Sequence, residues 1–446
     1  MNDPGTRAGQ AAPAGYWTAP TPEGTVHAEV RVPASKSITN RAYVLAALGR
    51  TPTLVRNPLD SRDARLMIDA LAVLGARHER LDDGIRVHPL AEADHARVER
   101  TASVDLGNSG TVARFTPALA TLGTVSVRFD GDRALRRRPM YGLIRALEDL
   151  GADIDHGDRS ALPFTVHGTG GLRGGPVDVD SSASSQFLSA LLLAGPAFDE
   201  GVTVRLVGEA PPSEPHIEMT LDLLRAFGAH PTREGTEFHV PPTELHRPEY
   251  TVEPDLSSAA PFLLAAALTG GTVHVAGWPA STTQPGDWLR RLLRELGMRV
   301  TRNASGLTVT GTGTIPGLEL DLHDVSELTP VITAMLCFAD GPSVIRGVAH
   351  LRGHETDRLA ALATEITGLG GAVTQIEDGL RIEPSPLRSG TFHTYEDHRL
   401  VMAAALLGLR VPGIAVENPA TVGKTFPGFV EEWTRMLRPA GDPPTR

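Results

Sequence analysis

Two series of glycines recur along this chain of 446 residues at nearly constant spacing, and they constrain its fold more than any other feature. In the first series, an apolar helical run ends at a glycine that opens a β-branched strand: Gly49, Gly123, Gly201, Gly271, Gly341 and Gly413. In the second, a leucine or phenylalanine ends a helical pattern directly before a glycine: Gly75, Gly151, Gly228, Gly297 and Gly370. The steps are 74, 78, 70, 70 and 72 residues in the first series and 76, 77, 69 and 73 in the second. Because glycine is the common residue just after a helix end, the shared period predicts six copies of a β/α unit of about 75 residues.

Each unit has the pattern of a strand, a helix, a strand, a helix and a β-hairpin, which we write βαβαββ. The motif Glu253-Pro254-Asp255 lies between the third and fourth units. Pro254 interrupts a strand pattern there, as expected where the chain crosses from one group of units to the next. We therefore expect an α/β fold with two lobes of three units each and a cleft between them.

The expected lobe boundaries follow from this crossing point. The first lobe is predicted to span residues 32–254, and the second to combine residues 25–31 with 255–446. Residues 1–24 are rich in Gly, Ala and Pro and lack the hydrophobic segment of a signal peptide. We expect them to form a flexible N-terminal extension.

Composition excludes several classes of protein. The hydrophobic fraction of 41% and the charged fraction of 21% are typical of a globular protein, and no apolar run reaches the length of a membrane span. A net charge of −11 argues against nucleic acids and anionic membranes as partners. The single cysteine, Cys337, excludes an internal disulfide and a cysteine metal cluster. We expect a cytoplasmic monomer that binds neither nucleic acid nor membranes.

Lysine is almost absent from this chain. Only Lys36 and Lys424 occur among 42 basic residues. A lysine ammonium differs from a guanidinium because it can lose its proton when its pKa is lowered. Lys36 lies in the segment Pro33 to Arg41, where an extended run turns into an apolar helical run, and a helix start offers free N–H groups to an anion. Both lysines are therefore candidates for chemistry, with ordinary surface lysines as the alternative.

Polar motifs mark the starts of most other helical runs. They are Gly107–Thr111 followed by Arg114, Ser181–Gln186, Arg136–Pro139, Glu327–Pro330, His354–Arg358, Tyr395–Arg399 and Val422–Pro427. Taken singly, each is explained by a turn, a helix cap or a dipole partner. Taken together in one cleft, their cations would require an anionic ligand with several phosphate and carboxylate groups. Glu327 and Glu355 are the candidates for proton transfer within such a cleft.

Six of these motifs, in this order, resemble the 5-enolpyruvylshikimate-3-phosphate (EPSP) synthase family of enolpyruvyl transferases. They are Pro-x-Ser-Lys-Ser-x-Thr-Asn-Arg at 33–41, Gly-Asn-x-Gly-Thr at 107–111, Ser-Ser-Gln-Phe at 184–187, Glu-Thr-Asp-Arg-Leu at 355–359, Asp-His-Arg at 397–399 and Lys-Thr-Phe-Pro at 424–427. The resemblance covers the chain from Thr25 to the last helical run near Leu437. It implies a two-lobed inside-out α/β barrel in which each lobe holds three βαβαββ units and the chain crosses between lobes twice.

The resemblance also implies an activity. Members of the family transfer the carboxyvinyl group of phosphoenolpyruvate to the 5-hydroxyl of shikimate 3-phosphate and release phosphate, without a metal or an organic cofactor. This reaction belongs to the shikimate pathway, which leads to chorismate and the aromatic amino acids. The family is the target of glyphosate.

Site residues follow from the matching motifs. The resemblance implies that shikimate 3-phosphate is bound by Lys36, Ser37, Arg41, Ser184, Ser185, Gln186, Ser213, Glu327 and His354. It implies that phosphoenolpyruvate is bound by Lys36, Asn108, Gly110, Arg138, Gln186, Arg358, Arg399 and Lys424. Glu327 is expected to be the base for the 5-hydroxyl and Glu355 the donor of a proton to the methylene carbon, with Lys36 as a third catalytic group.

Several residues depart from the family pattern. Ala34 stands where a glycine is usual, so this turn must avoid positive φ. Glu327 replaces the more frequent Asp, and Phe115 replaces the more frequent Pro. His350 and His354 occupy positions often held by Asn and Lys, which leaves the charge at the contact with shikimate 3-phosphate open.

Two alternatives remain at this stage. The related enolpyruvyl transferase that acts on UDP-N-acetylglucosamine has the same fold but uses a cysteine in a mobile loop of its first lobe. Here the loop Asp130–Arg133 has no cysteine, and Cys337 lies in an apolar run of the predicted second lobe. A non-enzymatic binder of phosphorylated metabolites is the other alternative, but binding alone would not require Glu327 and Glu355 among anionic ligands.

Overall fold

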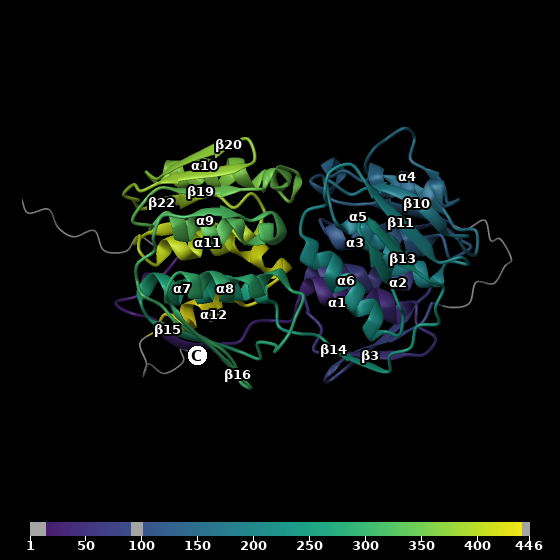
Figure 1. The fold of residues 1–446 in the computed structure, drawn as a ribbon, viewed down its shortest axis with the longest axis horizontal. Helices are drawn as coiled ribbons and strands as arrows, with labels where there is room; N and C mark the ends of the chain where they lie inside the picture. Colours follow the sequence, from purple (N-terminus) through teal and green to yellow (C-terminus); the bar gives the residue numbers. More distant parts are fainter. Residues whose placement is uncertain (1–14, 91–100, 439–446) are drawn as a thin grey trace, which may run out of the picture.

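The computed structural model describes residues 15–90 and 101–438. It consists of two halves that lie side by side (Figure 1). The N-terminal half has a hydrophobic core formed by residues between Ala34 and Val252. The core of the C-terminal half combines a short stretch from Ala19 to Val30 with residues between Leu256 and Met436.

Within the described residues, the N-terminal half contains three β-sheets, the helices α1 to α6 and two short 3₁₀ helices. Its strands are β3 (Thr53–Arg56), β4 (Arg77–Leu81), β5 (Gly84–His88), β6 (Thr101–Asp105), β7 (Ser126–Asp130), β8 (Asp153–Asp155), β9 (Phe164–His167), β10 (Gly175–Asp180), β11 (Val202–Val207), β12 (Thr232–Glu234), β13 (Glu237–Val240) and β14 (Glu249–Thr251). Its helices are α1 (Lys36–Ala47), α2 (Arg62–Val73), α3 (Gly110–Ala120), η1 (Leu135–Arg137), α4 (Tyr141–Asp149), α5 (Gln186–Ala194), η2 (Gly195–Ala197) and α6 (Glu214–Ala226).

The C-terminal half also contains three sheets. Its strands are β1 (Tyr16–Thr18), β2 (His27–Val30), β15 (Thr272–Ala276), β16 (Arg299–Asn303), β17 (Gly306–Thr310), β18 (Glu319–Asp321), β19 (Ser343–Arg346), β20 (Ala372–Ile376), β21 (Gly379–Glu383), β22 (Gly390–Phe392) and β23 (Ile414–Glu417). Its helices are α7 (Leu256–Thr269), η3 (Pro285–Trp288), α8 (Leu289–Glu295), η4 (His323–Leu328), α9 (Thr329–Leu336), η5 (Ala349–Gly353), α10 (Arg358–Gly368), α11 (His398–Gly408), η6 (Pro419–Lys424) and α12 (Phe429–Met436).

Five of the six sheets in the described residues share one topology. Two strands pair in parallel, a third is antiparallel to the second, and a hairpin partner closes the sheet, as in the order β6-β7-β9-β8. Each glycine of the second series directly follows the end of a helix and has a positive φ, which turns the chain from the helix into the hairpin. The φ angles are 111° at Gly75, 101° at Gly151, 96° at Gly228, 79° at Gly297 and 91° at Gly370. The helix ends predicted at these glycines are therefore confirmed.

The sixth sheet departs from the predicted unit. Its order is β1-β23-β22, so it has three strands, and β1 pairs antiparallel with β23 in the position that a hairpin strand takes elsewhere. The N-terminal segment supplies this strand, and Ala19 after it is buried. The expectation of a flexible extension is therefore wrong for Tyr16–Thr18, while residues 1–14 lie outside the described part of the chain.

Two segments connect the halves. Strand β2 pairs in parallel with β15 of the C-terminal half, whereas β14 pairs in parallel with β3 of the N-terminal half. The segments bond to each other where they cross: the backbone N of Ser35 donates to Glu253 O at 2.8 Å, and that of Asp255 donates to Pro33 O at 2.8 Å. This pairing places the starts of α1 and α7 next to each other. Ala34 has no positive φ, as its side chain requires.

Each half is organised around three buried helices. In the N-terminal half α1, α3 and α5 contact one another, and in the C-terminal half α7, α9 and α11 do so. Their residues are almost all buried because Ala, Leu and Val dominate these runs. Polar residues therefore gather where these helices begin. No helix in the described ranges is long and apolar enough to cross a membrane.

Candidate active site

A polar cavity lies between the two halves and is lined by residues at the starts of α1, α5, α7, α10 and α11. Twelve of the residues predicted from the sequence line it: Lys36, Ser37, Arg138, Ser184, Ser185, Gln186, Ser213, Glu327, His354, Glu355, Arg358 and Arg399. Four predicted residues do not line it: Arg41, Asn108, Gly110 and Lys424. The convergence of helix starts from both halves was expected, and the structure confirms it for these motifs.

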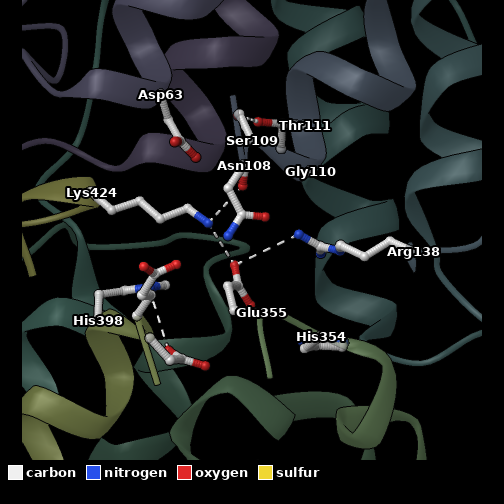
Figure 2. A network of polar contacts seen from close by, with 12 residues as sticks. Asp63, Asn108, Ser109, Gly110, Thr111, Arg138, His354, Glu355, His398 and Lys424 are labelled. Carbon is white, nitrogen blue, oxygen red and sulfur yellow. Dashed lines mark hydrogen bonds and ion pairs between the residues drawn. The ribbon is translucent and has the colours of Figure 1, made fainter. Parts of the chain in front are cut away.

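Glu355 is surrounded by cations from both halves. Its carboxylate lies 2.9 Å from the Lys424 ammonium, 2.9 Å from the Arg358 guanidinium and 4.0 Å from that of Arg138. Figure 2 shows Lys424 and Arg138 reaching it from opposite sides. Burial alone would raise the pKa of Glu355, but these cations together hold the pKa well below its ordinary value. The carboxylate is therefore ionised.

Glu327 has a different environment. The Ser257 hydroxyl donates a hydrogen bond of 3.0 Å to its Oε1 atom, and His216 Nε2 lies 3.9 Å from the same oxygen. Ser257 belongs to the first turn of α7 and His216 to α6 of the other half. Burial lowers the pKa of His216, although Glu327 opposes this shift. A neutral imidazole and a hydroxyl thus neighbour this carboxylate, in contrast to the three cations at Glu355.

Lys36 is the first residue of α1, where the Ser35 side chain caps the helix by accepting from Ile38 N at 3.4 Å. Its ammonium lies 3.7 Å from Oδ2 of Asp63, in the first turn of α2. Burial lowers the pKa of Lys36, and Lys424 adds to the shift while Asp63 opposes it.

Three histidines form a chain of ring contacts beside the cavity. The ring centroids of His323 and His350 are 5.9 Å apart, and those of His350 and His354 are 5.7 Å apart. His354 Nδ1 lies 3.3 Å from a guanidinium nitrogen of Arg358. Because a guanidinium only donates, Nδ1 must accept, so the proton of the neutral ring resides on Nε2. Burial and Arg358 lower the pKa of His354 well below its ordinary value, and burial lowers that of His350 to about 4.

Several buried polar atoms have no hydrogen-bond partner within the described residues. They include Nε and Nη1 of Arg138, Nε of Arg114, Oδ1 of Asn108 and Oε1 of Gln186. Arg138, Arg114 and Gln186 line the cavity. Buried polar atoms without partners are rare because each costs free energy. The arginine donors therefore indicate that the cavity binds an anionic ligand, and Oε1 of Gln186, an acceptor, indicates that the ligand also carries a hydrogen-bond donor.

The predicted residues outside the cavity have other contacts. Arg41 is directed inward: its guanidinium donates to Thr220 Oγ1 at 2.8 Å and to Ser189 Oγ at 3.3 Å. Burial lowers the pKa of Arg41 to about 9. Asn108 and Lys424 line an adjoining cavity instead, and Gly110 lies against the guanidiniums of Arg114 and Arg138. The assignment of Arg41 to a substrate stays a prediction.

Three residues of the site received no role from the sequence. His216 and Ser257 contact Glu327, and His398, at the start of α11, lines the cavity. His398 belongs to the Asp-His-Arg motif at 397–399, and His216 and Ser257 lie close to Ser213 and Asp255, but nothing in the sequence shows that residues 216, 257 and 327 meet. Asp63 begins an ordinary amphipathic helix and gives no signal of its contact with Lys36.

Cys337 is buried at the end of α9 and does not line the cavity. Burial raises the pKa of its thiol to about 12. The thiolate is the reactive form of cysteine, so this residue is unsuited to covalent chemistry.

Comparison with known proteins adds a family resemblance to this geometry. Residues 20–433 match the family described as EPSP synthase (3-phosphoshikimate 1-carboxyvinyltransferase). A 3-phosphoshikimate 1-carboxyvinyltransferase of Kocuria rhizophila is 49% identical over 434 residues, which cover 95% of this chain and 97% of the relative.

Two solved structures resemble the fold. An EPSP synthase structure from Acinetobacter baumannii superposes with a TM-score of 0.76 at 26% identity, covering 94% of this chain and 98% of that one. The enolpyruvyl transferase NikO from Streptomyces tendae gives a TM-score of 0.73 at 18% identity, covering 93% of this chain and 96% of that one. The second likeness concerns the fold alone.

Proposed function

This chain belongs to the EPSP synthase family, and from that premise we propose how its cavity performs the family's reaction. It is a 3-phosphoshikimate 1-carboxyvinyltransferase: the carboxyvinyl group of phosphoenolpyruvate passes to the 5-hydroxyl of shikimate 3-phosphate, and phosphate is released. The reaction belongs to the shikimate pathway. The observation that carries the residue assignments is the contrast between the two carboxylates of the cavity. Cations surround Glu355, whereas a hydroxyl and a neutral imidazole neighbour Glu327.

The first stage is an addition to the double bond of phosphoenolpyruvate. Glu327 takes the proton of the 5-hydroxyl, and the resulting oxygen bonds to the carbon that carries the phosphate. A proton is added to the methylene carbon, which becomes a methyl group, and Glu355 is the group assigned to deliver it. Glu355 is ionised in the free protein because Lys424, Arg358 and Arg138 lower its pKa. An anionic substrate that pairs with these cations weakens this effect, so that Glu355 takes up the proton it must deliver.

The second stage is an elimination. Glu355, a carboxylate again after the first stage, takes a proton from the methyl group, the double bond forms again, and the bond between carbon and the phosphate oxygen breaks. The proton that Glu327 took from the 5-hydroxyl passes to the leaving phosphate or to solvent. Phosphate leaves as an anion, so nearby cations stabilise the transition state. This role is assigned to Arg138 and Lys36, and it is supported by their position in the lining of the cavity and by the Arg138 nitrogens that have no hydrogen-bond partner in the described residues.

We assign the substrate contacts as the sequence predicts them. Shikimate 3-phosphate is assigned to Lys36, Ser37, Arg41, Ser184, Ser185, Gln186, Ser213, Glu327 and His354. Phosphoenolpyruvate is assigned to Lys36, Asn108, Gly110, Arg138, Gln186, Arg358, Arg399 and Lys424. The hydroxyls of Ser184 and Ser185, which line the cavity at the start of α5, support the phosphate site of the larger substrate, and the unpartnered Oε1 of Gln186 can accept from a substrate hydroxyl. His354 supplies a neutral Nε2–H donor at its contact.

We also propose that the halves are the two lobes of an inside-out α/β barrel with six βαβαββ units. The first lobe spans residues 32–254, and the second combines residues 25–31 with 255–446. The exchange of β2 and β14 between halves and the two separate hydrophobic cores support this division. A cytoplasmic monomer that binds only its small substrates is proposed from the sequence.

A phosphate-release assay tests the function. Purified protein is mixed with phosphoenolpyruvate and either shikimate 3-phosphate or UDP-N-acetylglucosamine, and released phosphate is measured. Release with shikimate 3-phosphate alone is the expected result. Release only with the nucleotide sugar, or with neither acceptor, would contradict the proposal, since the second result is that of a non-enzymatic binder.

A further inference from the structure

A second cavity, which we name the side chamber, adjoins the candidate active site. It is lined by Ala134, Arg137, Arg138, Arg352, Gly353, His354, Glu355, Thr356, Asp357, Tyr395 and Glu396. Four of these residues also line the main cavity: Arg138, Gly353, His354 and Glu355. The two cavities therefore meet beside Arg138 and Glu355. None of the serines assigned to the phosphate of the larger substrate lines the side chamber.

Three arginines give the side chamber its positive charge. Arg138 is only 8% exposed, and its Nε and Nη1 atoms have no hydrogen-bond partner in the described part of the chain, although Nη1 lies 4.0 Å from the Glu355 carboxylate. Arg352 donates to the backbone oxygens of Glu377 and Ile376 at 3.1 and 3.0 Å, and these neutral acceptors leave its charge uncompensated. Arg137 is exposed, and within residues 15–90 and 101–438 its guanidinium has neither an ion pair nor a hydrogen bond.

The carboxylates of the side chamber do not neutralise these cations. Glu355 is already paired with Lys424 and Arg358. The Asp357 carboxylate caps α10 by accepting from Ala360 N at 2.9 Å. Glu396 is exposed and also lines the cavity that contains Asn108 and Lys424. Three arginines thus face one available carboxylate.

We propose that the side chamber is a second binding position for a small anion with a phosphate group on its way to or from the catalytic cavity. This inference rests on the proposed function, which supplies two small anions with a phosphate group: phosphoenolpyruvate, which also carries a carboxylate, on entering and inorganic phosphate on leaving. The chamber adjoins the residues assigned to phosphoenolpyruvate, so a small anion passes through it while shikimate 3-phosphate occupies the other end of the cavity. Arg137 and Arg352 attract the anion by their charge. Arg138 lines both cavities, so it binds the anion where the side chamber meets the catalytic cavity.

Charge changes at Arg137 provide the test, because this side chain is exposed and its loss leaves no buried partner. In Arg137→Ser, kcat/KM for phosphoenolpyruvate should fall about 3- to 10-fold at low ionic strength, and in Arg137→Glu it should fall further. The difference from wild type should shrink towards none at about 0.5 M salt, since screening removes the attraction. The kcat/KM for shikimate 3-phosphate should change by less than about 2-fold, because the serines assigned to its phosphate do not line the chamber.

Product inhibition separates the two sources of the anion. If inorganic phosphate uses the chamber, its inhibition constant rises in Arg137→Ser, and if only phosphoenolpyruvate does, only kcat/KM falls. Arg302→Ser is the matched control, because Arg302 is an exposed arginine on β16 and lines neither cavity. It should leave all of these constants unchanged.

Wild-type turnover is measured first, because an inactive wild-type protein would contradict the proposed function itself. Calorimetric titration of inorganic phosphate into wild type and Arg137→Ser then tests anion binding in the side chamber without any turnover. Weaker phosphate binding in the variant supports the chamber. Identical binding and identical kinetics, or an equal loss for both substrates, would overturn the inference.

Discussion

The ammonium of Lys424 lies 3.0 Å from the backbone oxygen of Asn108, and the two residues belong to opposite halves of the molecule. The same ammonium lies 2.9 Å from the Glu355 carboxylate. One cation therefore bridges the halves and also contacts a proposed catalytic group. The halves are also joined by the two segments that pair at Ser35 and Glu253 and by a hydrogen bond of 3.2 Å from Ser213 N to His323 O. Binding of an anion at this position is thus coupled to the distance between the halves.

The first prediction follows from this coupling. Repulsion among the cations of the cleft favours separated halves in the free protein, and an anionic substrate brings them together. Small-angle scattering should show a smaller radius of gyration with shikimate 3-phosphate than without it. Lys424→Met removes the bridge to Asn108 and should reduce the change. An equal radius in both states of the wild type would contradict closure.

The second prediction concerns the proposed base. Glu327→Gln keeps the size of the side chain but cannot accept the hydroxyl proton, so turnover should fall by about 10²-fold or more. Binding of shikimate 3-phosphate should survive, because an amide still forms hydrogen bonds. Ser257→Ala, which removes only the hydrogen bond to Glu327, is the control and should cost much less. Near-normal turnover of Glu327→Gln would exclude the residue as the base.

The third prediction concerns proton uptake at Glu355. The cations around it lower its pKa in the free protein, and an anionic substrate that pairs with them raises it. Substrate binding therefore takes up protons at a pH between the two values, and by linkage the affinity must fall as pH rises through this range. Calorimetry of phosphoenolpyruvate binding in two buffers with different ionisation heats measures the uptake.

The control for proton uptake is Glu355→Gln, which has no titrating carboxyl group. Any uptake that remains in this variant belongs to other groups, such as His398, whose pKa burial lowers. Equal uptake in wild type and Glu355→Gln would remove Glu355 as the group that becomes protonated.

The fourth prediction concerns His354. Its pKa is well below the ordinary value of about 6.5, so the ring is neutral at neutral pH and donates through Nε2. Its charge therefore changes only at more acidic pH, and the ratio of shikimate 3-phosphate affinities of wild type and His354→Lys should stay constant between about pH 6.5 and 8. His354→Lys should bind more tightly by on the order of 1 kcal/mol, about fivefold, because its donor is charged. A wild-type affinity that falls through this range relative to the variant would show that His354 binds as a cation.

Local signals in the sequence predicted much of the fold. Glycines with positive φ end the helices at Gly75 and Gly151, and this requirement is visible in the sequence because other residues rarely adopt the conformation. The crossing at Pro254 was likewise predicted. Strand β1 was missed because Tyr16–Thr18 lie in a Gly- and Pro-rich segment and pair through their backbone with residues about 400 positions away.

The site was predicted less completely than the fold. A motif places Lys36 and Glu355 at helix starts, and their convergence follows from the repeated unit. The direction of a side chain within a motif does not follow, and Arg41 is directed towards Thr220 and Ser189 rather than into the cavity. Contacts between distant segments, such as Ser257 with Glu327, depend on the packing of whole helices and have no local signal.

The last prediction concerns inhibition by glyphosate, which resembles phosphoenolpyruvate but is longer. We expect the wild-type protein to be inhibited in competition with phosphoenolpyruvate. A methyl group at Gly110 would lie 3.0 Å from Nη1 of Arg114 and 3.0 Å from Nη2 of Arg138. The end of the Arg138 side chain must then shift into the space that the ligands share, and the longer ligand has less room to adjust.

Gly110→Ala should therefore weaken glyphosate more than phosphoenolpyruvate. Crowding by one methyl group in a packed site costs on the order of 1–3 kcal/mol, or about 5- to 150-fold in binding. The inhibition constant and the KM for phosphoenolpyruvate are measured together in the variant, with wild type as the reference. If both rise by the same factor, the methyl group acts only through Arg138, which both ligands use, and Gly110 does not discriminate between them.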